Sequence, residues 1–316
     1  MKRSHLVAAL LAAFTINFQS SAQADTFGAG TSNQFTVDFV EIGNTTNTNS
    51  SLGYGAVPYQ YRMGKYEISQ LQVTKATLLG LAGVSTTASS SNRPAASVTW
   101  YEAAAFVNFL NTNSGKTAAY NLTLSNTTWS MNLQATNQAW TLGGTNLYRN
   151  KDAFYFLPSE NEWFKSAYYN PSNSTYYTYP LGANSPPTQL GNQGGTNPGS
   201  AVYIPNIFEP GAAEVQRAGG LSPYGAMGLP GNVWDWCESA FDGTNNSGSE
   251  NRIFRGGVYG QGANLIVSSY RQSVAPTTGT ADMGFRVASV PEPSTYALFL
   301  LGAGAAYLWQ RRKRSL

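Results

Sequence analysis

The sequence has a single histidine, His5, and a single cysteine, Cys237. His5 lies in an N-terminal segment that we interpret as a cleaved leader, so the mature chain would have no imidazole for proton transfer or metal ligation. Serine triads, cysteine–histidine dyads and histidine-based zinc or iron sites are thereby excluded. One cysteine also excludes an intrachain disulfide, so we expect the hydrophobic core alone to stabilise the chain.

Charged residues are also scarce, at 11% of 316 residues, which is about half the usual share. The formal net charge of +3 comes from the two ends of the chain, where Lys2, Arg3 and the basic cluster at 311–314 lie. Between residues 25 and 290 there are 13 basic and 15 acidic residues. A nucleic-acid-binding domain concentrates positive charge on its folded surface, so we expect no nucleic-acid partner.

The first 24 residues predict a secretory signal peptide. Residues 1–5 are basic, residues 6–18 are apolar, and Ala22-Gln23-Ala24 is a small-x-small cleavage site. We expect the mature protein to begin at Asp25. An anchored N-terminal helix is the alternative, but the apolar run is too short to cross about 30 Å of hydrocarbon.

The C-terminal residues 290–316 predict a second sorting signal. A proline–glutamate–proline triplet precedes an apolar stretch at 296–309, which is about 21 Å long as a helix and therefore short for a permanent membrane span. A basic cluster follows and would hold this end in the cytoplasm. The motif residues are Pro291, Glu292, Pro293, Arg311, Arg312, Lys313 and Arg314.

In this order, the three features resemble the PEP-CTERM sorting signal of Gram-negative bacteria. The resemblance implies export across the inner membrane, transient anchoring by the C-terminal segment, and processing by an exosortase, which is a transpeptidase-like membrane protease. It also implies a location at the cell surface or outside the cell and a link to exopolysaccharide. A plain tail anchor is the alternative.

The region from 27 to 289 reads as one domain, because no internal repeat or long linker divides it. Its apolar content is too high for disorder. Capping boxes predict three short helices, since a Ser or Thr and a Glu or Gln three residues later satisfy the free amide groups of a helix start. These pairs are Ser69 with Gln72, Thr99 with Glu102, and Ser159 with Glu162.

The pattern of apolar residues places one face of each later helix in the core. Trp100, Ala103, Ala104, Val107 and Leu110 recur at helical spacing, and Trp163, Phe164 and Ala167 do so after the third capping box. Short apolar runs at 35–42 and 252–254 predict brief strands. Residues 112–150 and 171–222 are rich in Asn, Thr and Gly, so we expect ordered surface loops there.

A series of short motifs extends along this domain. They are Met63-Gly-Lys-Tyr-Glu-Ile, Val98-Thr-Trp-Tyr-Glu-Ala, Leu157-Pro-Ser-Glu-Asn-Glu-Trp, Tyr179-Pro-Leu-Gly, Pro230-Gly-Asn-Val-Trp-Asp-Trp, Arg255-Gly-Gly and Gly284-Phe-Arg. In this order they resemble the formylglycine-generating enzyme, or sulfatase-modifying factor, family. The resemblance implies a single α+β domain with an elaborated C-type-lectin-like fold and much irregular structure.

Most of these motif residues can also be explained by a structural role. Trp234 and Trp236 are expected to anchor the core. Arg255 and Arg286 are expected to bridge loops by binding carbonyl or carboxylate oxygens. The acidic residues Glu160, Glu162, Asp235 and Glu238 form candidate acid pairs, but helix-cap and surface roles explain them with fewer assumptions.

Enzymes of the family hold copper(I) with two cysteines that follow the Arg-Gly-Gly motif, as the resemblance implies. The two expected positions fall near Gln261 and Ile266, and the segment 258–271 contains no cysteine. Copper(I) requires soft thiolate ligands, so we expect no copper and no formylglycine-generating activity. Cys237 lies in another motif, and we interpret it as a small buried residue.

Some relatives bind calcium at the Gly-Asn-Val-Trp-Glu turn. Gly231, Val233 and Asp235 match the positions of its ligands, but the side-chain ligand expected three residues before Gly231 is replaced by Gly228. Calcium requires six to eight oxygens, so these residues predict at most a degenerate site. Beyond that, we expect no cofactor.

These features predict an exported, non-enzymatic module for binding or structure, whose partners would be an exosortase-type protease and an exopolysaccharide or surface protein. Tyrosine and tryptophan on a weakly charged surface suit such contacts. The alternative is an oxidoreductase with altered, cysteine-independent chemistry in the same fold. A pocket of converging polar groups at 258–271 would favour the enzyme, and a flat or filled surface there would favour binding.

Overall fold

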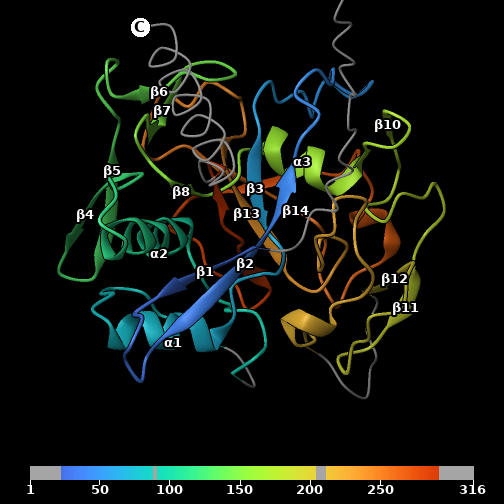
Figure 1. Cartoon of the computed structure of the whole chain (residues 1–316), viewed down its shortest axis with the longest axis horizontal. Coiled ribbons are helices and arrows are strands. Elements are labelled where there is room, and N and C mark those ends of the chain that lie inside the picture. Colours follow the sequence, from blue (N-terminus) through green and yellow to red (C-terminus); the bar gives the residue numbers. More distant parts are fainter. Residues whose placement is uncertain (1–22, 88–90, 204–210, 292–316) are drawn as a thin grey trace, which may run out of the picture.

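The computed structural model describes residues 23–87, 91–203 and 211–291 (Figure 1). The predicted leader lies almost entirely outside these residues. So do Glu292, Pro293 and the basic residues 311–314 of the predicted sorting signal, whereas Pro291 is the last residue described. Among the described residues, no helix has the length and apolar character needed to span a membrane.

The three helices begin where the capping boxes predict. They are α1 (Gln70–Leu78), α2 (Trp100–Asn113) and α3 (Glu160–Tyr168). At each start, the side chain of Ser69, Thr99 or Ser159 accepts a hydrogen bond from the backbone three residues later, and the reciprocal bond is present. The sequence was sufficient to predict these helix starts, because both residues of a capping box lie within one helical turn.

The main sheet is antiparallel and contains strands from both ends of the domain, in the order β1-β2-β3-β17-β8. A second sheet has the order β15-β14-β13-β16. The strands of the first sheet are β1 (Gln23–Phe27), β2 (Phe35–Ile42), β3 (Tyr61–Gly64), β17 (Ala288–Ser289) and β8 (Tyr155–Phe156). Those of the second are β15 (Gln272–Val274), β14 (Arg252–Arg255), β13 (Trp234–Ala240) and β16 (Met283–Gly284).

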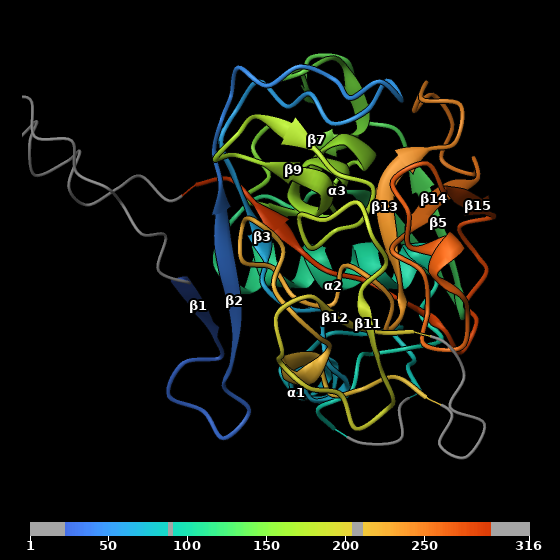
Figure 2. The ribbon, with the colours of Figure 1, turned by 90° about the vertical axis from the view of Figure 1, so that its right-hand side faces the viewer.

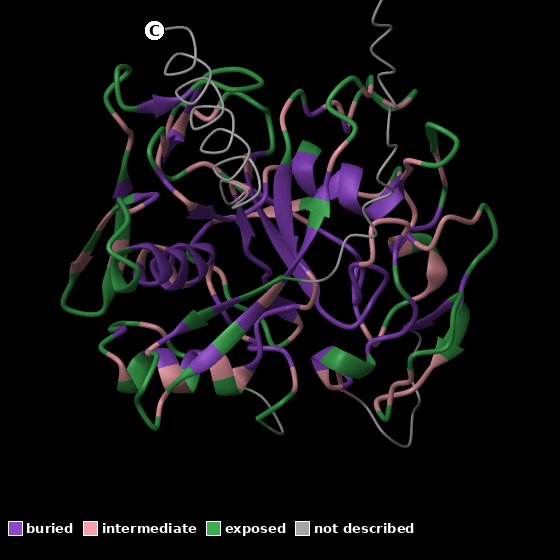
Figure 3. Ribbon diagram, in the orientation of Figure 1, coloured by how far each residue is buried: buried purple, intermediate pink, exposed green. Residues whose placement is uncertain are grey.

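Figure 2 shows β1 and β2 along one side of the molecule, β13, β14 and β15 along the opposite side, and α2 and α3 between them. The predicted inward face of α2 is buried, and so are residues on its other sides, which leaves ten of its 14 residues in the core. Figure 3 shows the same burial along α2 and α3 and in the central strands. Trp163, Phe164 and Ala167 of α3 are fully buried as predicted.

The predicted loops at 112–150 and 171–222 contain more strand than expected. The first holds two hairpins, and the second holds short strands and a 3-10 turn. In the first hairpin Leu122, Leu124, Trp129 and Met131 alternate with polar residues, a period-two signal that the surrounding Asn and Thr obscured. The strands are β4 (Asn121–Ser125), β5 (Thr128–Asn132), β6 (Ala139–Trp140), β7 (Asn146–Asn150), β9 (Tyr169–Asn170), β10 (Thr175–Tyr176), β11 (Thr188–Leu190) and β12 (Ser200–Val202), and the 3-10 turns are η1 (Val215–Arg217) and η2 (Ala263–Leu265).

Several of the few charged residues of this chain are buried. Five arginines are at most 1% exposed, namely Arg62, Arg149, Arg252, Arg255 and Arg286. Each forms an ion pair with an acidic side chain. Arg255 and Arg286 also donate to backbone carbonyls, which confirms their predicted bridging role. Because an unpaired buried charge is very costly, these pairs fix how the loops meet.

Candidate functional site

The segment after Arg255-Gly256-Gly257 has an apolar side chain in the core at one of the two expected ligand positions. Ile266, one of the two positions where the family resemblance places a metal ligand, is fully buried and clusters with Tyr179, Ala201 and Tyr203. Its side chain packs directly on Gly257, where an added Cβ would overlap it. This position is therefore part of the core.

Gln261, the other of these positions, is exposed at the surface. It lies between the Arg-Gly-Gly motif and η2, and its backbone amide donates to the carbonyl of Val258. Within the described ranges, no group of three or more His, Cys, Asp or Glu side chains is placed to hold a metal ion. The pair Gln261 and Ile266 therefore offers one amide and one aliphatic group, neither of which is a soft ligand for copper(I).

The Gly-Asn-Val-Trp-Asp turn is buried, and its carboxylate faces a guanidinium. Asp235 Oδ2 accepts hydrogen bonds from Arg286 Nε at 2.7 Å and from Trp163 Nε1 at 2.9 Å. Gly231 and Val233 lie on the same buried turn. Trp234 and Trp236, which flank Asp235, are buried and serve as the predicted core anchors.

A second buried carboxylate, Glu67, adjoins this turn and was not singled out from the sequence. It accepts hydrogen bonds from Asn232 Nδ2 at 2.7 Å and from the Val233 amide at 3.4 Å. Glu67 Oε2 lies 2.9 Å from where a Cβ of Gly228 would be, so the missing side chain at Gly228 leaves the space that Glu67 occupies. Glu67 belongs to the Met63-Gly-Lys-Tyr-Glu-Ile motif, which was the only sequence signal for it.

Burial and the neighbouring charge of Asp235 raise the pKa of Glu67 well above its usual value. Burial also raises the pKa of Asp235, although Arg286 opposes this shift. Both shifts disfavour a negative charge on the two carboxyls at the same time. Because Arg286 already supplies the positive charge, these groups fit a divalent cation poorly, and calcium binding at Gly231, Val233 and Asp235 stays a prediction.

Cys237 is fully buried in the core, as predicted. Burial, reinforced by the negative charge of Glu160, raises the pKa of its thiol well above the usual value. A thiol held in its protonated form is a poor nucleophile and a poor metal ligand. Its backbone carbonyl accepts a hydrogen bond from Trp100 Nε1 at 2.9 Å, so this residue joins β13 to α2.

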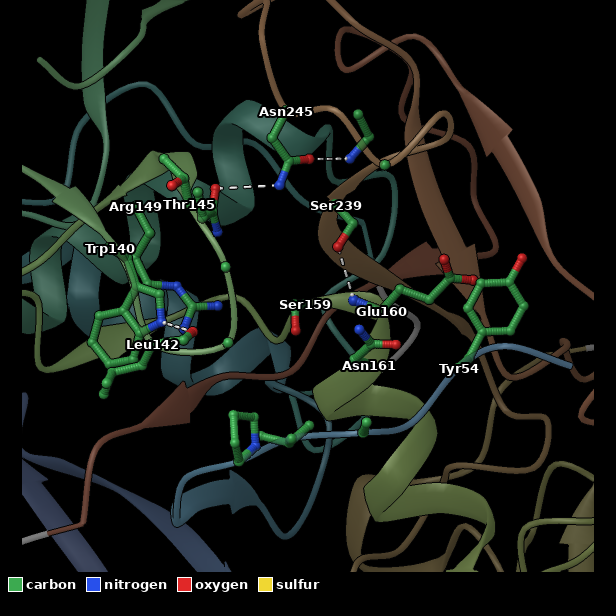
Figure 4. Close-up of a pocket in the computed structure, with 18 of the residues that line it drawn as sticks. Tyr54, Trp140, Leu142, Thr145, Arg149, Ser159, Glu160, Asn161, Ser239 and Asn245 are labelled. Carbon is green, nitrogen blue, oxygen red and sulfur yellow. Dashed lines mark hydrogen bonds between the residues drawn. The ribbon is translucent and has the colours of Figure 1, made fainter. Parts of the chain in front are cut away.

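A polar cleft with a volume of about 460 Å³ lies next to Arg271, the last residue of the segment 258–271 (Figure 4). Its lining residues come from 53–59, 140–149, 159–161 and 239–245, together with Arg271. These are the loop before β3, the β6–β7 hairpin, the start of α3, and the end of β13 with the turn that follows it. We call it the α3 cleft. Its volume is within the range of small-molecule sites in proteins.

The Arg149 guanidinium forms one wall of the α3 cleft. It donates to both oxygens of Glu162 at 3.0 and 2.9 Å, and to Glu238 at 2.9 and 2.7 Å. It also lies 3.7 Å from the centre of the Phe156 ring. Burial alone would raise the pKa of Glu162, but Arg149 and the hydrogen bond from Tyr59 lower it below the usual value.

Glu160 and Arg271 form the opposite wall, and Arg255 lies behind it. Glu160 is 5% exposed and accepts from Arg255 Nε at 2.8 Å and from Arg271 Nε and Nη2 at 2.9 and 2.8 Å. Arg255 also donates to the carbonyls of Ser268 and Tyr270. One carboxylate thus joins the start of α3 to the segment that follows the Arg-Gly-Gly motif.

Figure 4 shows Trp140 and Arg149 on one side of the cleft, Tyr54 and Glu160 on the other, and Ser159 and Asn161 between them. Asn161 Oδ1 accepts from the Gly55 amide at 3.0 Å, which fixes the loop before β3 against α3. The α3 cleft is therefore a preformed polar cavity with aromatic rings along its walls.

The structure corrects one interpretation of the acidic residues. Glu162 caps α3 as expected, but Glu160, Glu162, Asp235 and Glu238 are all buried and ion-paired, so their predicted surface roles are wrong. Their arginine partners are distant in sequence, and no local pattern indicates them. The cleft residues Thr145 and Asn245 carried no sequence signal either.

The comparisons with known proteins agree with this architecture. The chain matches the Sulfatase-modifying factor enzyme 1-like domain over residues 27–290 and the PEP-CTERM protein-sorting motif over residues 289–314. A search of curated proteins finds no match. The PEP-CTERM match implies export with processing by exosortase-type machinery.

Several solved structures resemble the fold, among them the following two. Treponema denticola variable protein 1 is 19% identical with a TM-score of 0.55, and the match covers 85% of this chain and 99% of that one. The crystal structure of CarF is 16% identical with a TM-score of 0.57, and the match covers 81% of this chain and 99% of that one. These likenesses confirm the predicted α+β fold of the formylglycine-generating-enzyme and C-type-lectin-like type. The chain therefore belongs to the sulfatase-modifying factor enzyme 1-like family and ends in a PEP-CTERM sorting motif.

Proposed function

We propose that this protein is a non-catalytic binding or structural module of the cell surface or extracellular matrix, linked to exopolysaccharide. The observation that carries the proposal is the buried Ile266, which packs on Gly257 where the family resemblance places a metal ligand. An aliphatic side chain there offers neither a ligand nor space for a substrate. The sorting motif supports the location, since it implies export and transient anchoring.

The absence of oxidase activity is directly testable. Purified mature protein supplied with copper(I) and a cysteine-containing peptide is expected to consume oxygen no faster than buffer, because the segment 258–271 contains no thiolate. Oxygen electrode traces and mass spectrometry of the peptide measure this. A family member that has the cysteine pair is the positive control. Turnover above the buffer rate would favour the alternative, an oxidoreductase with cysteine-independent chemistry.

Binding is tested with the exopolysaccharide of the bacterium that makes the protein. The mature domain is expected to be retained on a column of this polysaccharide, because loop-rich, weakly charged surfaces with tyrosine and tryptophan suit such contacts. An exported domain of similar size and charge from another family serves as the control and should pass through. If the domain elutes with this control and also shows enzymatic turnover, the ranking of the two functions is reversed.

A further inference from the structure

We propose that the α3 cleft binds a short stretch of uncharged polysaccharide. This inference rests on the proposed function, which it deepens by naming the site and the class of ligand. The cleft is separate from Gln261 and Ile266, the two positions where the family resemblance places the metal ligands, because neither residue lines it. Three properties of its walls restrict the class of ligand: the balance of charges, the polar groups that remain available, and the aromatic rings.

The charges of the residues that line the cleft cancel. Four charged residues line it, of which Arg149 and Arg271 are basic and Glu160 and Asp242 are acidic. Three further charged residues lie directly behind the walls. Glu162 and Glu238 are ion-paired with Arg149, and Arg255 is ion-paired with Glu160. An anionic ligand would therefore gain no unpaired counter-charge here. A cationic ligand would find only the solvent-exposed carboxylate of Asp242, whose contribution water screens, whereas an uncharged ligand has no ion pair to displace.

Polar groups remain available around the centre of the cleft. Asn161 uses its carbonyl oxygen to accept from Gly55, which orients its amide nitrogen as a donor for a ligand. Ser239 Oγ accepts from the Glu160 amide at 3.0 Å, so its hydroxyl proton is available to donate. Thr145 contributes an exposed hydroxyl on the β6–β7 side. Sugar hydroxyls both donate and accept, so they match such a mixed set.

Aromatic rings lie at the edge of the cleft where a sugar ring would stack. Phe241 is 46% exposed and Tyr54 is half-buried. The Arg271 guanidinium lies 4.3 Å from the centre of the Phe241 ring and 5.2 Å from that of Tyr54, which holds both rings in place. A ring that is already fixed binds the apolar C–H face of a sugar at low entropic cost.

The cleft wall is also rigid. Lys165 Nζ donates to the carbonyls of Asn44 and Val57 at 3.0 and 3.2 Å, so α3 holds the loop before β3 from behind. Together with the Arg149 and Glu160 ion pairs, these bonds preform the site. A preformed site fits a long polymer, of which only a few units contact the protein, because little ordering energy is needed.

The experiment measures binding of defined oligosaccharides to the mature protein by calorimetry. The probes are uncharged oligomers of glucose, galactose, mannose and N-acetylglucosamine, with oligogalacturonate as the anionic probe and a chitosan oligomer as the cationic one. We expect at least one uncharged probe to bind and to bind more tightly than either charged probe. Preference for a charged probe, or no binding of any uncharged one, would overturn the proposal.

Two substitutions assign the binding to the cleft. Asn161→Asp keeps the acceptor for Gly55 but removes the donor, and an acid is favourable at this early position of α3, so the fold should persist. Phe241→Ala removes the exposed ring. Each is expected to weaken binding of the uncharged probe by roughly tenfold or more. Leu78→Ala, which changes a 65% exposed side chain on α1, is the matched control and should bind as the parent does.

A second cavity of about 320 Å³, beside Trp129 on the β4–β5 hairpin, gives the competing location. If Trp129→Ala removes binding while Asn161→Asp and Phe241→Ala do not, the assignment to the α3 cleft fails. In that case the protein still binds polysaccharide, and the proposed function stands. If the parent protein binds no uncharged oligosaccharide and is not retained on the host exopolysaccharide, the assignment to the cleft and the proposed function both fail. The retention experiment therefore distinguishes a failure of the cleft assignment from a failure of the proposed function.

Discussion

Replacing Arg149 with methionine is expected to lower the free energy of unfolding by about 3–5 kcal/mol. Arg149 is the guanidinium that faces the buried carboxylates of Glu162 and Glu238, whose side chains are fully buried. Methionine has a similar length, so it would fill the space over the Phe156 ring but leave two carboxylates without their cation. Chemical denaturation monitored by tryptophan fluorescence measures the loss.

The matched control is Lys151→Met. Lys151 forms an ion pair with Asp152 at 2.6 Å, as close as the buried pairs, but the two side chains are 44% and 56% exposed. Exposed pairs contribute about 0–1 kcal/mol, so this substitution should change stability little. Equal losses for the two variants would contradict the view that burial makes the Arg149 pairs important.

The Arg149→Met deficit should also depend on pH. In the parent protein, the folded-state pKa of Glu162 is below its unfolded value, so its stabilising contribution is complete above the unfolded pKa and is lost as pH falls through the folded one. Without the guanidinium, burial would raise this pKa, and protonation would relieve the unpaired charge. The difference between parent and variant should therefore shrink from about pH 7.5 to about pH 5.

Replacing Gly231 with alanine is expected to cost about 2–5 kcal/mol, because a left-handed backbone and a steric overlap act together. Gly231 has a φ of +85°, and an added Cβ would overlap the carbonyl oxygen of Val202. That carbonyl accepts a hydrogen bond from the Asn232 amide at 2.7 Å, so it has no freedom to move away. Thermal and chemical unfolding both report the loss.

Gly30→Ala separates the two contributions. Gly30 has a φ of +79°, close to that of Gly231, but no atom lies within 4 Å of its added Cβ. This variant should show only the backbone cost of about 1–2 kcal/mol. If Gly231→Ala is no worse than Gly30→Ala, the approach between the buried turn and β12 is looser than the structure indicates.

Local signals in the sequence were sufficient for the helices. The starts of α1, α2 and α3 were predicted from pairs of residues three apart, such as Thr99 with Glu102, because a capping box is complete within a few residues. The family fold was also recognised from short motifs in order. The strands at 121–132 differ from the predicted loop, because the Asn- and Thr-rich composition there obscures the alternation of Leu122 and Leu124 with polar residues.

The α3 cleft could not be predicted from the sequence, because the residues that line it are far apart along the chain. Arg149 pairs with Glu238, which is 89 residues away, and Asn161 binds Gly55, which is 106 residues away. Hydropathy places such residues on the surface, whereas ion pairing allows them to be buried. The scarcity of charge was the one hint, because a chain with few charges has little reason to bury them unless each has a structural role.

The position of β17 has a mechanical consequence for sorting. β17 ends at Ser289, and the PEP-CTERM match begins at that same residue, so the sorting motif directly follows the last strand of the domain. β17 is hydrogen-bonded to β3 on one side and to β8 on the other. While the signal is anchored, residues 290–295 are all that joins this strand to the apolar stretch at 296–309, so the domain stays close to the lipid headgroups. A force on the anchor would therefore act on a strand that is hydrogen-bonded along both edges, so proteolytic cleavage rather than unfolding of this strand would release the domain.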